Sequence, residues 1–373
     1  MSDILVCCAV GAENPGGLKR VNGDGEIIWS KDLKTSGIAV EICPTSGDIY
    51  VSHYLNTDNV NMRRISATTG EDVWAVGSLY ASSAIYGIDA QVEFDKDWFW
   101  VSGTNLQGDV SLFSNPCIAK HSKTNGSMIQ RGPNSGADSL RYSLCIREKR
   151  NTTNDNSGSA LVYWSSPDSI RWRQAVADSD LTTYNQYIRY GRMRSMVHHG
   201  DPTDGGRGTS LYYSKTHHSS QAWNTGRHEG GTLHSHGTTN NTCYNIASQY
   251  KSSDLSELIV PHGQTGISFS FTIYNPLSGS PSGQNVFQYS PPGGPIGRCG
   301  GYDTDTDEYF LGHQADSNGK HITKTDNTGS VIWTLDVGGN PTSMVSLGSE
   351  DAPGANASSS GGAAHLAFFS GCR

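Results

Sequence analysis

Histidines are concentrated in one stretch of this chain and are the first candidates for chemistry. Seven of the 13 lie between residues 198 and 236: His198, His199, His217, His218, His228, His234 and His236. In a β-strand, His234 and His236 would place both imidazoles on the same face, because side chains alternate with a period of two. Such a pair suits Zn, Ni or Cu. Since no HExxH phrase accompanies the cluster, ordinary polar surface is the alternative, and metal binding stays open.

Alternating carboxylates form a second candidate. Asp303-Thr-Asp-Thr-Asp307 could present several oxygens to one calcium ion. It lacks the glycine and the terminal glutamate of an EF-hand loop, and Asp and Thr are also common in plain turns. Both a calcium site and a structural turn between two strands therefore remain open for Asp303–Asp307.

The eight cysteines form no CxxC pair, and most lie in apolar, strand-like text. This pattern favours buried free thiols over metal ligands. One pairing is left open: if the chain ends share a sheet, Cys372 would lie near Cys7 or Cys8.

No phrase in the chain brings together a nucleophile, a base and an orienting group, and no metal motif is strong. We therefore expect a protein that is not an enzyme, with no catalytic, cofactor-binding or metal-binding residues and no cofactor.

The elements that would position these residues are set by a recurring phrase. Its clearest copies are Leu18–Trp29, Met62–Trp74 and Ile322–Trp333. Each reads as a strand, a polar turn with a glycine, and a second strand that carries tryptophan. Internal repeats at a period of a few tens of residues indicate a repeat fold. Because the repeated unit is a β-hairpin, we expect a β-propeller.

Degenerate copies fill the space between the clear ones. The markers recur at intervals of 43 to 64 residues: Trp29, Trp74, Ile129, Trp172, Trp223, Phe287 and Trp333. A four-stranded blade with its turns needs roughly 40–50 residues. We therefore predict one all-β domain over residues 1–373, a seven-bladed propeller of four-stranded antiparallel blades. The five tryptophans among the markers should occupy equivalent outer hairpins.

Closure of the ring requires the chain ends to meet, because an open sheet edge invites aggregation. Ile4–Val10 reads as a strand with no partner before it, and His365–Ser370 as one with nothing after it. We expect the N- and C-terminal strands to share the closing blade, with Ser343–Leu347 as its innermost strand.

The repeated phrase resembles the PQQ-like, quinoprotein-type propeller repeat, in which a Thr-Gly or Asp-Gly turn precedes a strand with a tryptophan. In enzymes of that kind, vicinal cysteines form a strained ring beside the cofactor. Here Cys7 and Cys8 stand in a terminal strand, where alternation sends them to opposite faces. The resemblance therefore implies the propeller but not the cofactor chemistry.

The net charge and the lack of long apolar runs restrict the classes of partner that we expect. The chain carries a net charge of −8, whereas nucleic-acid surfaces are normally basic. No apolar run approaches the length of a membrane span. We expect neither nucleic acid nor membrane as a partner, and the N-terminal residues show no signal peptide.

In style, the acidic chain rich in Gly, Ser, Thr and Asn resembles bacteriophage tail proteins. This resemblance implies a non-catalytic structural or contact protein of the virion, made in the host cytoplasm. It would bind other virion proteins in a symmetric multi-copy assembly, or a host surface glycan or protein. The alternative is a cellular protein- or glycan-binding propeller scaffold; a PQQ-like enzyme is the third interpretation. We place the contacts in the irregular stretches 148–158, 200–209, 224–242 and 275–284.

Overall fold

The structure is a computed structural model of the 373-residue chain. It describes residues 3–10, 16–42, 46–54, 56–77, 84–89, 98–104, 116–131, 144–149, 159–165, 169–176, 180–189, 192–199, 210–216, 223–229, 232–239, 249–250, 258–263, 269–274, 284–289, 296–303, 306–314 and 320–347. Side chains between β8 and β23 are described only at Phe99, Val101 and residues 121–129.

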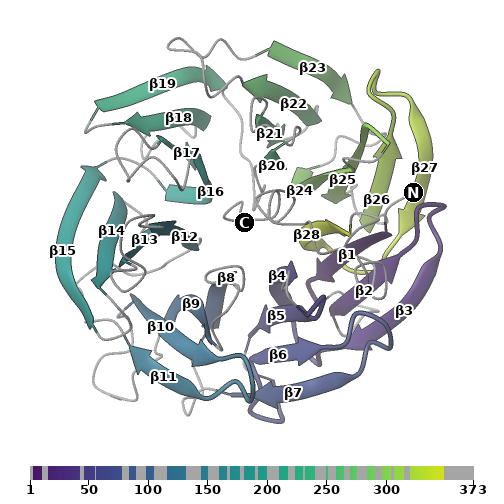
Figure 1. Ribbon diagram of the computed structural model, residues 1–373. Helices are drawn as coiled ribbons and strands as arrows, with labels where there is room; N and C mark the ends of the chain where they lie inside the picture. Colours follow the sequence, from purple (N-terminus) through teal and green to yellow (C-terminus); the bar gives the residue numbers. More distant parts are fainter. Residues whose placement is uncertain are drawn as a thin grey trace, which may run out of the picture.

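The described strands form seven four-stranded antiparallel sheets, and these residues contain no helix. The sheets stand around a ring like the blades of a propeller, as Figure 1 shows. The first strands in chain order are β1 (Asp3–Cys8), β2 (Gly17–Val21), β3 (Ile27–Asp32), β4 (Gly37–Ile42), β5 (Ile49–His53), β6 (Met62–Ile65), β7 (Asp72–Val76), β8 (Ala84–Asp89), β9 (Trp98–Thr104), β10 (Pro116–Ser122) and β11 (Met128–Arg131). The predicted all-β propeller architecture is thus confirmed.

The other described strands follow in chain order. They are β12 (Leu144–Lys149), β13 (Ser159–Ser165), β14 (Ser169–Val176), β15 (Asp180–Arg189), β16 (Arg192–His199), β17 (Ser210–Thr216), β18 (Trp223–Glu229), β19 (Thr232–Thr239), β20 (Gln249–Tyr250), β21 (Leu258–Gly263), β22 (Phe269–Tyr274), β23 (Gln284–Tyr289), β24 (Ile296–Asp303), β25 (Glu308–Gln314), β26 (Lys320–Thr325), β27 (Val331–Asp336) and β28 (Pro341–Leu347). Within each sheet the lowest-numbered strand lies nearest the ring centre, except in the sheet that joins the two ends of the described chain.

That sheet, the closing blade, has the strand order β28-β1-β2-β3. Strand β28 is innermost and pairs antiparallel with β1, from Asp3 opposite Leu347 to Cys8 opposite Pro341. The predicted innermost place of Ser343–Leu347, in the same blade as the N-terminal strand, is confirmed. The predicted strand His365–Ser370 lies outside the described residues.

Alternation along β1 explains where the core lies. Leu5 and Cys7 pack into a cluster shared with blade β4–β7, whereas Ile4, Val6 and Cys8 pack into one shared with blade β24–β27. Successive side chains of a strand point to opposite faces, so one short apolar strand supplies both neighbouring interfaces. The core of this fold therefore lies between blades.

The marker residues separate into two groups. Trp29, Trp74 and Trp333 lie in β3, β7 and β27, each the outermost strand of its sheet. Trp172 and Trp223 lie instead in β14 and β18, the third strands of their sheets. The prediction of equivalent positions is wrong for these last two. Their phrases lack the glycine turn, so no local signal indicates where their hairpins begin and end.

One predicted irregular stretch is largely regular. Residues 224–242 contain most of β18 and all of β19, a paired hairpin. Gly, Asn and His lower β-propensity, but pairing with a neighbouring strand overrides that preference. Residues 200–209 and 275–283 lie outside the described residues, as do 150–158.

Candidate functional site

Each clear copy of the repeated phrase joins its blade to the next one. Trp29 Nε1 donates a hydrogen bond of 3.1 Å to the carbonyl of Ala67, in the β6–β7 turn of the neighbouring blade. The indole also lies over Gly70, where an added Cβ would meet it at 3.0 Å. Gly70 has φ of 72°, a conformation that L side chains rarely adopt. Glycine is therefore required both by the turn and by the docked indole.

The same docking recurs on both sides of this pair. Trp333 donates to the carbonyl of Gly23 at 2.9 Å, and Trp74 donates to that of Lys123 at 2.9 Å. The turn glycines beneath them, Gly25 and Gly126, also have positive φ. Three consecutive blade interfaces are thus fastened by one device.

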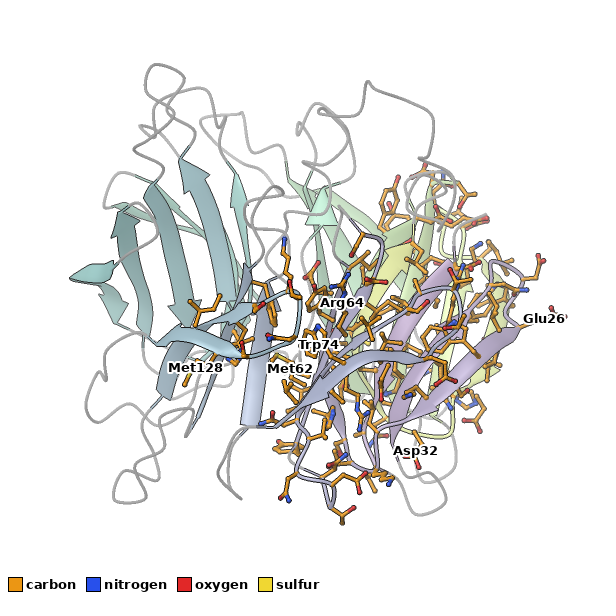
Figure 2. All side chains as sticks on the ribbon, turned by 60° about the horizontal axis from the view of Figure 1, so that its bottom comes forward. Glu26, Asp32, Met62, Arg64, Trp74 and Met128 are labelled. Carbon is orange, nitrogen blue, oxygen red and sulfur yellow. The ribbon has the colours of Figure 1, made fainter. Side chains whose placement is uncertain are left out.

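A cation shares each of these carbonyl acceptors. Arg20 Nη1 donates to the Ala67 carbonyl at 2.6 Å, beside Trp29, and its guanidinium also pairs with Asp3. Arg64 Nη1 donates to the Lys123 carbonyl at 2.8 Å and pairs with Asp48. Figure 2 shows Arg64 and Trp74 close together on the outer hairpin.

The third copy replaces arginine by lysine. Lys324 Nζ donates to the Gly23 carbonyl at 3.3 Å and pairs with Glu308 at 2.5 Å. We call each set of carboxylate, cation, tryptophan and shared carbonyl an inter-blade clamp. Sequence reasoning did not find the cations, although Arg20, Arg64 and Lys324 stand at the same place in the three phrases and gave a readable signal.

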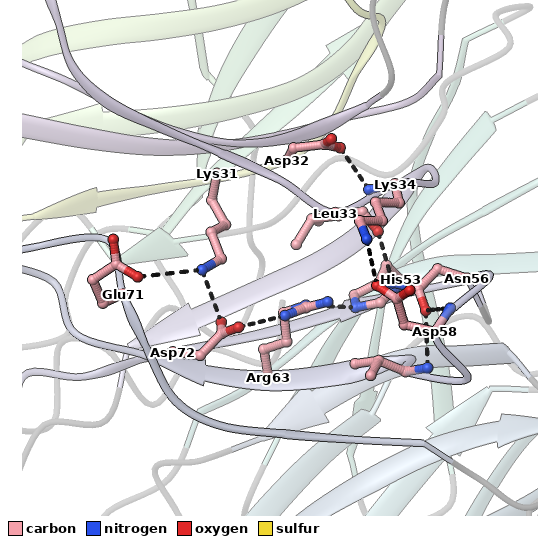
Figure 3. Close-up of polar contacts among 11 residues, drawn as sticks. Lys31, Asp32, Leu33, Lys34, His53, Asn56, Asp58, Arg63, Glu71 and Asp72 are labelled. Atoms are coloured by element: carbon pink, nitrogen blue, oxygen red, sulfur yellow. Dashed lines mark hydrogen bonds and ion pairs between the residues drawn. The ribbon is translucent and has the colours of Figure 1, made fainter.

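A polar chain crosses the interface of the closing blade with blade β4–β7 (Figure 3). Lys31 Nζ, on β3, lies 3.3 Å from Asp72, whose carboxylate also pairs with Arg63 at 2.5 Å. Arg63 Nε then donates to His53 Nε2 at 3.3 Å, so His53 is held as a neutral acceptor. Burial lowers the pKa of His53 to about 4, and Arg63 acts in the same direction.

A second buried histidine occupies the corresponding strand of blade β24–β27. His313 Nε2 lies 2.8 Å from Thr323 Oγ1, which in turn contacts Thr334 Oγ1. Burial lowers the pKa of His313 to about 4, and His321 adds to the shift. Both imidazoles are therefore structural, uncharged groups at neutral pH.

The outermost strands present apolar side chains to solvent at one repeated position. The residues just before the tryptophan, or before Gln130 in β11, are between 42 and 54% exposed: Ile27, Ile28, Val73, Met128, Ile129, Val331 and Ile332. We call them the apolar rim. They belong to four consecutive blades and follow the hairpin turns, whose tips carry residues such as Glu26 (Figure 2). These residues recur at the same position in each outer strand, whereas isolated exposed apolar residues are common on protein surfaces.

The seven histidines singled out in the sequence lie on several different strands or outside the described residues. His198 and His199 lie in β16, His228 in β18, and His234 and His236 in β19, whereas His217 and His218 lie outside the described residues. The imidazoles of all seven are outside the described part of the structure, so metal binding there stays a hypothesis.

The Asp303–Asp307 stretch forms a turn at its described ends. Asp303 is buried and its carbonyl accepts from the amide of Asp307, whose side chain accepts from Tyr302 and Asn327. Thr304 and Asp305 lie outside the described residues. Among the residues whose side chains are described, no three His, Cys, Asp or Glu come together as metal ligands.

The three cysteines whose side chains are described, Cys7, Cys8 and Cys299, are buried free thiols. Cys7 and Cys8 point into different blade interfaces, and burial raises the pKa of Cys8 to about 12. Cys372 lies outside the described residues, so its pairing stays untested. Nor does the described part contain a helix able to cross a membrane.

Comparison with known proteins finds likeness in structure but not in sequence. No protein-family model matches the chain, and no curated protein matches it. Its structure is similar to a periplasmic gluconolactonase of Pseudomonas aeruginosa, with a TM-score of 0.61, 13% identity, and 92% and 98% of the two chains covered. A candidate 6-phosphogluconolactonase from Bacteroides fragilis gives a TM-score of 0.58 at 11% identity, with 93% and 98% covered.

A third similar structure is dihydro-haem d1 dehydrogenase NirN in complex with DHE. Its TM-score is 0.53 at 11% identity, covering 90% of this chain and 63% of the other. At these identities the likeness shows the fold alone, which is a β-propeller.

The comparisons correct one expectation. We expected a protein that is not an enzyme, because no catalytic phrase could be read in the sequence. Solved structures of the same fold, matching over nine tenths of this chain, include a gluconolactonase. The scaffold is therefore one on which catalysis occurs, and the absence of a recognisable phrase does not exclude it.

Proposed function

We propose that this protein is a structural contact protein that binds a macromolecular partner through the apolar rim. The carrying observation is the recurrence of half-exposed aliphatic side chains on the outer strands of four consecutive blades. Exposed apolar patches on a protein surface commonly mark an interaction site. The clamps beneath it hold the outer hairpins in place, so a partner meets a preformed surface.

The partner class follows from the composition. We propose a bacteriophage virion as the setting, with other virion proteins or a host surface glycan or protein as partners. The acidic, hydroxyl- and amide-rich composition of the chain supports this proposal. The runner-up is a cellular protein- or glycan-binding scaffold. In either setting we propose that the seven sheets are the complete set of blades, built from PQQ-like repeats.

Paired substitutions on the same strands test the role of the rim. Ile28→Lys with Val73→Lys places two charges on the rim, whereas Ser30→Lys with Ala75→Lys places two charges at exposed positions beside it. Both double variants should fold, as judged by circular dichroism and thermal melting. Loss of incorporation into particles by the first variant alone is the expected result; equal incorporation of the two variants would reject the rim.

The setting is tested separately, by mass spectrometry of purified particles and by a glycan array. Absence from particles together with specific glycan binding favours the cellular scaffold. Since the fold includes a gluconolactonase, hydrolysis of gluconolactones belongs in the same set of measurements. Turnover at an ordinary enzymatic rate would replace the contact proposal.

A further inference from the structure

The outer edge strand of one blade is longer than those of the other blades. β15 has ten residues and is the longest strand described, and it ends the sheet β12-β13-β14-β15. Its sequence, Asp-Leu-Thr-Thr-Tyr-Asn-Gln-Tyr-Ile-Arg, contains no Lys, Pro or Gly. Proteins usually guard such edges with lysine, proline or short strands, because a free edge offers backbone donors and acceptors to another strand.

The middle of β15 is regular. Thr183–Tyr187 pairs with β14 without a break, and the two register shifts lie near the ends of the strand. Threonine and tyrosine favour extended structure. No other strand of the described part of the chain pairs with the outer edge of β15. These five consecutive residues therefore present an unbroken ladder edge, long enough to bind one more strand.

The order of residues in β15 fits a second copy of itself. A two-fold axis through Asn185 would pair Asn185 with its own counterpart, Tyr184 with Gln186, and Thr183 with Tyr187. Antiparallel pairing also places Asp180 of one copy near Arg189 of the other, so opposite charges approach each other at both ends of the paired strands. Isologous contacts of this kind give closed dimers and do not propagate into fibres.

We propose that two copies of this protein associate through β15, forming one continuous eight-stranded antiparallel sheet across a two-fold axis at Asn185. The surface is distinct from the apolar rim, which lies on β3, β7, β11 and β27. The two proposals therefore stand or fall independently.

Charge substitutions at the two-fold axis give a test that separates loss of the dimer contact from misfolding of the variants. Asn185→Lys and Asn185→Asp each place two like charges opposite one another, which should weaken the dimer by at least about tenfold. Mixing the two variants in equal amounts pairs unlike charges and should restore the dimer. Sedimentation velocity over a range of concentrations measures both effects, with Ser30→Lys on β3 as the folded control that leaves association unchanged.

A measurement on the unmodified protein covers the case in which the variants fold poorly. Amides of residues 180–189 should exchange more slowly with deuterium as protein concentration rises, while those of β3 should not change. A monomer at all concentrations, exchange in β15 independent of concentration, or a mixture of folded variants that fails to associate would each overturn the proposal.

Discussion

Two arcs of the ring differ in the length and tryptophan content of their outer strands. From β24 to β11 the blades have outer strands of four to six residues, and three of the four blades carry clamps with tryptophan. From β12 to β19 the outer strands have ten and eight residues and contain no tryptophan. The first arc thus shows clamps between its blades, whereas the described backbone of the second shows longer strand pairing within each blade.

The largest effect should come from removing a clamped indole. Trp74 is buried against Tyr50 and Phe99, so Trp74→Ala should cost about 3–5 kcal/mol of unfolding free energy. Trp172→Ala, in the third strand of the other arc, should cost less. Urea unfolding measures both. Equal costs would show that the clamp is not what distinguishes the arcs.

The next effect in size should be a loss of folding stability at acid pH, caused by two buried histidines of the clamped arc. His53 and His313 have a pKa of about 4, below the usual 6.5, so the unfolded chain binds more protons in this range. Stability is then full above about pH 6.5 and falls as pH drops toward 4, by about 3 kcal/mol for each group. Urea unfolding at pH 7 and pH 4.5 tests this, and His53→Gln should flatten the slope. An unchanged slope in that variant would assign the acid sensitivity elsewhere.

The cation of a clamp should contribute less than its tryptophan. Arg64→Met removes one of two donors to the Lys123 carbonyl and leaves Asp48 without this partner. We expect a loss of about 1–3 kcal/mol. Adding Asp48→Asn should recover part of it, because the unpaired carboxylate is then removed. A double variant that is no better than the single one would mean that the carboxylate is adequately solvated.

The smallest effect should come from trying to extend the clamps into the second arc. Gln130 in β11 stands where its neighbours have tryptophan. The corresponding turn of the next blade, residues 177–179, reads Ala-Asp-Ser and offers no glycine. Gln130→Trp should therefore change the unfolding free energy by less than about 0.5 kcal/mol. A gain of more than about 1 kcal/mol would show that a glycine is not needed to receive the indole.

The sequence predicted the fold wherever glycine and tryptophan occurred together. Gly70 is required by its own φ and by Trp29 above it, so both residues leave a readable trace. Trp172 and Trp223 had no such glycine, and their strand was misassigned. The apolar rim could not be recognised, because exposure of Ile28 depends on which strand ends the sheet. Pairing in β19 was missed for the same reason, since it depends on β18 rather than on local propensity.

The antiparallel pairing of β1 with β28 determines how the ring responds to mechanical force. Asp3 lies opposite Leu347, so the first residue of β1 and the last residue of β28 lie at the same end of the ladder. Tension between them would unzip the pairs one at a time, starting there, instead of shearing them together. A ring held by buried interfaces would therefore open readily when β1 and β28 are drawn apart at that end.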